Sequence, residues 1–89
     1  MAHIVKRKGH KEKFDARKVY ASVYAACRNA HLSEIQSEKI ADSVTKTVEK
    51  WIADKAEVSS QQIFEEITKI LRHLEPDTAF LYETHRDIV

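Results

Sequence analysis

A cluster of cations near the N-terminus is the part of this sequence best suited to binding a ligand. Between positions 6 and 13 the chain carries four lysines and Arg7 against one acidic residue, Glu12. The whole chain has 15 Lys and Arg and 14 Asp and Glu, so its formal net charge is only +1. A local positive cluster on a nearly neutral chain favours a discrete anion site over a general nucleic-acid surface. Because arginine can make forked contacts to phosphate while lysine acts as a point charge, Lys6 and Arg7 predict a polyphosphate site.

The elements that must position these cations are a β-hairpin and the helix after it. Residues 3–14 alternate as two strands around Gly9, the single glycine of the chain, which accepts the positive φ that hairpin turns often need. Asp15 then ends the return strand, and aspartate is a preferred helix N-cap. A basic hairpin is also typical of a solvated sheet edge, where lysines discourage association between strands. The residues alone leave both interpretations open.

The order of these residues resembles a known family, the ATP-cone domain. The resemblance rests on Ile4-x-Lys6-Arg7-x-Gly9 and Glu12-x-Phe14-Asp15-x-x-Lys18-Val19, then on Val58-Ser59-Ser60-x-x-Ile63, Ala79-Phe80-Leu81-Tyr82 and His85-Arg86. It covers essentially all 89 residues in order. The family's domain binds ATP or dATP as an allosteric effector in ribonucleotide reductases, and it also occurs in a repressor of reductase genes.

The resemblance implies a set of nucleotide-binding residues. Lys6 and Arg7 match the family's phosphate-binding pair, and Lys18 matches a basic residue that also reaches the nucleotide. Polar positions near the base and ribose, an apolar wall and a second contact region at the start of the third helix complete the site. The full set is Ile4, Lys6, Arg7, Glu12, Asp15, Lys18, Ser60 and Phe64.

Two positions depart from the family pattern. The residue after the Lys-Arg pair is often acidic or neutral in the family, whereas Lys8 adds positive charge near the expected phosphates. Phe64 replaces a polar contact of some members, so the base pocket is expected to be more apolar or only partly formed. These departures leave the preference between ATP and dATP open.

The remaining sequence predicts one mostly helical α+β domain, a four-helix bundle capped by the N-terminal β-hairpin. Eighty-nine residues are too few for two domains, and 43% of them are hydrophobic. Helical periodicity and capping signals predict helices over 16–30, 34–54, 60–74 and 76–87, with a short strand at 57–58 beside the hairpin. In the third helix, one apolar face comprises Ile63, Ile67, Ile70, Leu71 and Leu74.

The sequence contains no catalytic motif such as a nucleophile elbow or a Walker-type loop. Its single cysteine, Cys27, lies on an apolar helical face, which indicates a core residue in a reducing compartment. The five histidines lack paired metal-ligand spacing. Without a signal peptide or long apolar run, we expect a cytoplasmic protein that has no membrane contact and is not an enzyme.

We therefore expect a regulatory domain that senses ATP or dATP, with or without Mg²⁺. Nucleotide binding would order the hairpin and change a surface for self-association or for a protein partner. One alternative is a protein-interaction module with a degenerate nucleotide site. Another is a small nucleic-acid-binding module that uses the same basic hairpin, although the near-neutral net charge argues against it.

Overall fold

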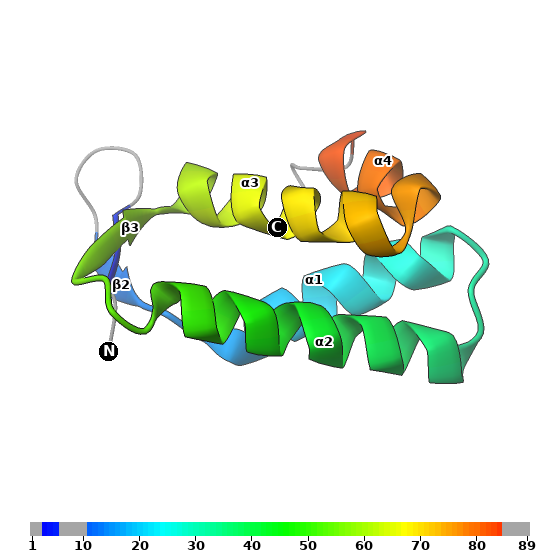
Figure 1. Ribbon diagram of the computed structural model, residues 1–89, viewed down its shortest axis with the longest axis horizontal. Helices are drawn as coiled ribbons and strands as arrows, with labels where there is room; N and C mark the ends of the chain where they lie inside the picture. Colours follow the sequence, from blue (N-terminus) through cyan, green and yellow to red (C-terminus); the bar gives the residue numbers. More distant parts are fainter. Residues whose placement is uncertain (1–2, 6–10, 85–89) are drawn as a thin grey trace.

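The computed structural model describes residues 3–5 and 11–84, which are mostly helical with a small β component. The elements follow the chain in the order β1 (His3–Val5), β2 (Lys11–Lys13), α1 (Ala16–Asn29), α2 (Glu34–Ile52), β3 (Glu57–Ser59), α3 (Ser60–Leu74) and α4 (Pro76–Thr84) (Figure 1). The predicted α+β class with a majority of helix is confirmed. The expected hairpin turn, with Lys6, Arg7 and Gly9, lies outside the described residues, as does the expected helical stretch 85–87.

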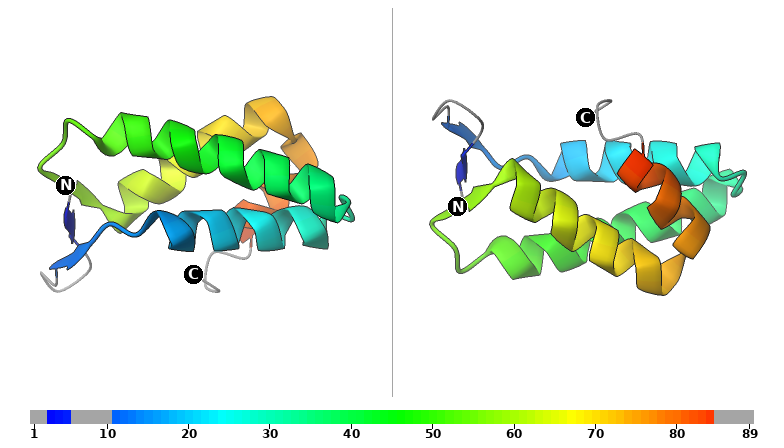
Figure 2. Two further views of the ribbon diagram at one scale, coloured as in Figure 1. Left: turned by 90° about the horizontal axis from the view of Figure 1, so that it is seen from below. Right: turned by 90° about the horizontal axis from the view of Figure 1, so that it is seen from above.

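The three strands form one small sheet in the order β2-β1-β3. β1 pairs with β2 in antiparallel fashion, with Ile4 opposite Glu12, and with β3 in parallel, with Ile4 opposite Val58. The antiparallel pair is the arrangement that a hairpin requires, and β3 supports it because two short strands alone are marginally stable. The sheet lies at one end of the molecule, where α1 and α3 both begin (Figure 1; Figure 2).

Side-chain caps fix the starts of the first three helices. Asp15 accepts a hydrogen bond from the backbone N–H of Arg17 and caps α1. The helices α2 and α3 each begin with a complete capping box, in which a serine hydroxyl and a glutamine side chain satisfy each other's backbone N–H groups. The pairs are Ser33 with Gln36 and Ser59 with Gln62.

Two helices end earlier than the sequence predicts. The helix α1 ends at Asn29, and His31 takes a left-handed conformation with φ 67°, while the backbone N–H of Leu32 reaches back to the Cys27 carbonyl oxygen at 3.1 Å. The helix α2 ends at Ile52, whose carbonyl oxygen accepts a hydrogen bond from the Lys55 N–H at 3.0 Å. Both ends are therefore closed by turn hydrogen bonds.

The core lies between the four helices and continues to β3. Among the described residues its buried hydrophobic members are Val19, Val23, Ala26, Cys27, Ala41, Val44, Val48, Ile52, Val58, Ile63, Ile67, Leu71, Ala79 and Tyr82. The helix α4 folds back across α1 and α3, as Figure 2 shows. One predicted core position is wrong: Leu74 is 45% exposed, because α3 ends at this residue and the chain turns away into α4.

Candidate functional site

The helices α1 and α3 both start at the sheet, so their N-terminal ends lie at the same end of the molecule (Figure 1). α1 begins three residues after the end of β2, and α3 follows β3 without an intervening residue. The N-terminal end of a helix carries a partial positive charge, which favours anions. Asp15 and Ser59 already accept one N–H group each at the starts of α1 and α3. This end of the molecule can therefore hold a negatively charged ligand.

The first turn of α1 concentrates charged groups in a defined geometry. The Oδ1 atom of Asp15 accepts hydrogen bonds from the Arg17 backbone N at 3.0 Å and from Arg17 Nε at 3.2 Å. The Oδ2 atom lies 3.3 Å from Arg17 Nη2, so the guanidinium contacts both carboxylate oxygens. These hydrogen bonds hold the pKa of the Asp15 carboxyl below its usual value and raise the pKa of Arg17.

Lys18 stands next to this pair and adds a second cation to the first turn. Its side chain is exposed, and its backbone N donates to the Asp15 carbonyl oxygen at 3.1 Å. Its charge also contributes to the low pKa of Asp15. The structure thus brings Asp15 and Lys18, two residues of the expected set, together in one helical turn.

Arg17 was not among the residues that the sequence predicted for the site. A signal for it exists in the sequence: α1 has no acidic residue in its first turn, whereas Arg17 and Lys18 follow the cap directly. The helix dipole disfavours cations at this end, and Arg17 partly offsets this by its ion pair with Asp15.

The strand residues of the expected set lie opposite each other in the sheet. Ile4 on β1 is half-buried and packs against the core, and it pairs in register with Glu12 on β2. Lys6 and Arg7, which carry the expected phosphate contacts, follow β1 directly but lie outside the described residues.

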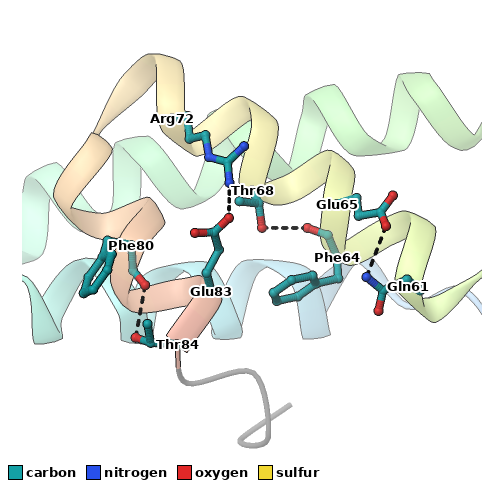
Figure 3. A network of polar contacts seen from close by, with 8 residues as sticks. All are labelled: Gln61, Phe64, Glu65, Thr68, Arg72, Phe80, Glu83 and Thr84. Carbon is teal, nitrogen blue, oxygen red and sulfur yellow. Dashed lines mark hydrogen bonds and ion pairs between the residues drawn. The ribbon is translucent and has the colours of Figure 1, made fainter.

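The two expected residues on α3 occupy different environments. Ser60 is exposed in the first position of the helix. Phe64 is half-buried, and its ring stacks on Tyr82 of α4 with a centroid distance of 5.3 Å and an interplanar angle of 19°. The Phe64 carbonyl oxygen accepts a hydrogen bond from Thr68 Oγ1, and Figure 3 shows this contact beside the ion pair between Arg72 and Glu83. The ring of Phe64 therefore contributes to the packing of α3 against α4.

Metal sites and membrane-spanning helices have recognisable geometries, which can be compared with residues 3–5 and 11–84. No group of three or more His, Cys, Asp and Glu side chains in this part of the chain is arranged to hold a metal ion. None of its helices is long and apolar enough to cross a membrane. Cys27 is a free, buried cysteine, and burial raises the pKa of its thiol.

Comparison with known proteins identifies both a family and a relative. The sequence model of the family described as the ATP cone domain matches residues 2–88. The transcriptional repressor NrdR of Sorangium cellulosum (strain So ce56) is 29% identical to this chain over 89 residues. That alignment covers 96% of this chain and 57% of the repressor, so the chain spans little more than half the length of this relative.

Proposed function

Because this chain belongs to the ATP cone domain family, we propose that it is a regulatory domain that senses ATP or dATP and catalyses no reaction. The observation that carries this proposal is the cationic first turn of α1, which lies at the same end of the molecule as β1, the strand that precedes Lys6 and Arg7 (Figure 1). A triphosphate placed there meets the N-terminal end of α1 and charged side chains from two elements.

Each expected site residue has a role in this proposal. Lys6, Arg7 and Lys18 bind the phosphates, with Mg²⁺ as an optional companion of the triphosphate. Asp15 and Glu12 accept hydrogen bonds from sugar or base, since carboxylates repel phosphate and suit hydroxyl donors. The base lies toward the remaining positions, which are Ile4, Ser60 and Phe64.

Regulation requires that the nucleotide bind one conformation of the domain more tightly than another. We infer that the nucleotide fixes the β1–β2 pair against the start of α1 and thereby changes a surface for a protein partner or a second copy. Such coupling is reciprocal, so the partner must change the affinity for the nucleotide by the same factor and in the same direction.

Titration calorimetry with ATP, dATP, ADP and GTP, with and without Mg²⁺, tests the proposal. We expect saturable binding that is selective for adenine. Replacing Arg7 by alanine should weaken it by about 1.5–3 kcal/mol, the scale of a hydrogen bond to a charged group. The matched control is Arg28→Ala, which removes an exposed arginine from the other end of α1 and should leave affinity unchanged. Absence of heat and of thermal stabilisation with every nucleotide would instead favour a protein-interaction module.

The name of the relative motivates a second candidate, a nucleic-acid-binding module. The relative is called a transcriptional repressor, and that activity belongs to a protein of which this chain matches little more than half. Fluorescence anisotropy with labelled DNA over a salt series tests the candidate. Binding through several phosphates would weaken steeply with salt, whereas a nucleotide sensor of net charge +1 should show no such binding.

A further inference from the structure

Arg17 has an unusual combination of exposure and order. Its side chain is 91% exposed, yet the guanidinium turns back and contacts both oxygens of Asp15. An isolated surface ion pair is worth little, so stability alone gives a weak reason to place a cation at the positive end of a helix. Arg17 therefore has a position that costs helix stability and suits an anionic ligand.

The hydrogen-bond donors of Arg17 are only partly used by this contact. A guanidinium carries five N–H donors in a rigid plane. One on Nε and one on Nη2 donate to Asp15, which leaves three donors on a strongly exposed side chain. A planar group that holds a carboxylate along one edge can present its other edge to a phosphate.

We propose that Arg17 is a bridging residue of the nucleotide site, which holds Asp15 through Nε and Nη2 and donates its remaining N–H groups to a nucleotide phosphate. The inference rests on the proposed function and adds a residue that the expected set lacks. It also answers an electrostatic problem of that set, because the Asp15 carboxylate would otherwise repel the phosphates beside it. Arg17 neutralises this charge and keeps the carboxylate oriented as helix cap and sugar acceptor.

The bridge makes Arg17 a determinant of selectivity for phosphorylated ligands. Its benefit grows with the number of phosphate charges within reach, so ATP should depend on it more than AMP. Lysine can replace the charge but cannot contact a carboxylate and a phosphate along two edges, so Arg17→Lys should recover only part of the affinity. The low pKa of Asp15 agrees with a carboxylate that stays ionised within the bridge.

The test measures ATP and AMP binding by calorimetry over a series of salt concentrations. The variants are Arg17→Ala, Arg17→Lys, Asp15→Asn and the double variant Asp15→Asn/Arg17→Ala, with Arg28→Ala as the matched control on the same helix. We expect Arg17→Ala to weaken ATP binding by about tenfold to a hundredfold and AMP binding by about threefold or less. Its ATP affinity should also depend less on salt.

The double variant separates the bridge from a simple charge effect. Asparagine is as good an N-cap as aspartate, so Asp15→Asn retains the cap while it removes the negative charge that Arg17 neutralises. Loss of Arg17 should therefore cost less ATP affinity in the Asp15→Asn background than in the wild type. Helical content and the thermal midpoint of each variant show that the fold is kept.

Three results would overturn the inference, and they can be distinguished from one another. If the wild type binds ATP and Arg17→Ala binds ATP and AMP as the wild type does, the bridge is wrong while the nucleotide sensor stands. If the wild type binds no nucleotide, the proposed function fails and the bridge fails with it. Equal losses for ATP and AMP would also contradict the bridge, since a structural defect at the cap does not distinguish the two ligands.

Discussion

At the scale of single residues, the core environment of Cys27 raises the pKa of its thiol. The residue has no exposed surface, and burial is the main reason that the pKa of its thiol is raised above the ordinary value of 9.0. The charge of Glu75 raises this pKa further. Tyr82 is buried in the same core, and its pKa is raised above 10.0 mainly by burial.

We predict that the protein loses stability as pH rises past 9.0 and that Cys27→Ala reduces this loss. The folded thiol has the higher pKa, so the unfolded chain gives up its proton first. The contribution of the thiol is therefore complete below the unfolded pKa and is lost as pH rises through the folded pKa. Urea unfolding at neutral and alkaline pH measures how the free energy of unfolding changes with pH.

The alanine variant is expected to be less stable at every pH because it leaves a small cavity. The test therefore compares how steeply the free energy of unfolding falls with pH, and not its absolute value. A variant in which Tyr82 is replaced by phenylalanine serves as control, because its effect should begin only near 10.0. If the stability of Cys27→Ala falls as steeply at alkaline pH as that of the wild type, groups other than Cys27 cause the loss of stability.

Some site residues could be predicted from the sequence, whereas others depend on side-chain packing. Asp15 and Lys18 were predicted for the site, and they meet in one helical turn because cap and first turn are local features. The role of Arg17 depends on how its side chain turns back onto Asp15, which a pattern of residue types does not encode. The stacking of Phe64 on Tyr82 depends on where α4 packs, and this contact is not local in the sequence.

At the scale of elements, Ser59 joins the sheet to α3. It is the last residue of β3, pairs with Val5 of β1, and caps α3 by accepting a hydrogen bond from the Gln62 backbone N at 3.0 Å. Gln62 Oε1 accepts in return from the Ser59 backbone N at 2.9 Å. The start of α3 is thus fixed relative to the sheet by one residue.

We predict that Ser59→Ala and Ser60→Ala have different effects, although the two serines are neighbours. Ser59→Ala removes the cap and should lower the free energy of unfolding by about 0.5–2 kcal/mol. Ser60 is exposed, so Ser60→Ala should change it by less than about 0.5 kcal/mol while weakening nucleotide binding. Urea unfolding and calorimetry with ATP measure the two effects. A Ser60→Ala variant that binds ATP like the wild type would remove Ser60 from the proposed site.

Helix starts were more predictable than helix ends for a local reason. A helix cap depends on the type of one or two residues, so the sequence indicates it directly. Asp15 caps α1, Ser33 caps α2 and Ser59 caps α3. The ends of α1 and α2 carry no glycine, and each is determined by how the following turn folds back. Left-handed His31 illustrates this, because a histidine there is not a sequence signal for a helix end.

At the scale of the whole molecule, the described part is elongated, with extents of 36 × 24 × 19 Å. The sheet and the starts of α1 and α3 lie at one end, and the turn between α1 and α2 lies at the other (Figure 1; Figure 2). The helix α4 packs on both α1 and α3. Its contacts with α3 include the stack of Phe64 on Tyr82 and the ion pair between Arg72 and Glu83, which Figure 3 shows. A change at the starts of α1 and α3 can therefore reach α4 by direct packing.

We predict that ATP slows amide hydrogen exchange unevenly along the molecule. Amides of β1, β2, β3 and the first turns of α1 and α3 that exchange by local opening should slow, because the proposed ligand contacts these segments. Amides of the turn around His31 that exchange by local opening should not change. Amides that exchange only by global unfolding should all slow by the same factor. This factor corresponds to a rise of about 2.7 kcal/mol in the free energy of unfolding when the ATP concentration is a hundred times its dissociation constant.

The behaviour of α4 then decides how far the effect of the nucleotide extends. Slower local exchange in Pro76–Thr84 would mean that binding stabilises the packing of α4, which would make its outer surface, with Phe80 at 64% exposure, the candidate surface for a partner. Unchanged local exchange in α4 would place the regulated surface at the sheet end instead. The Arg7→Ala variant is the control, since its weaker binding should make the slowing of exchange smaller in every segment at the same ATP concentration. Equal slowing in every segment would contradict a localised site, because it would reveal global stabilisation alone.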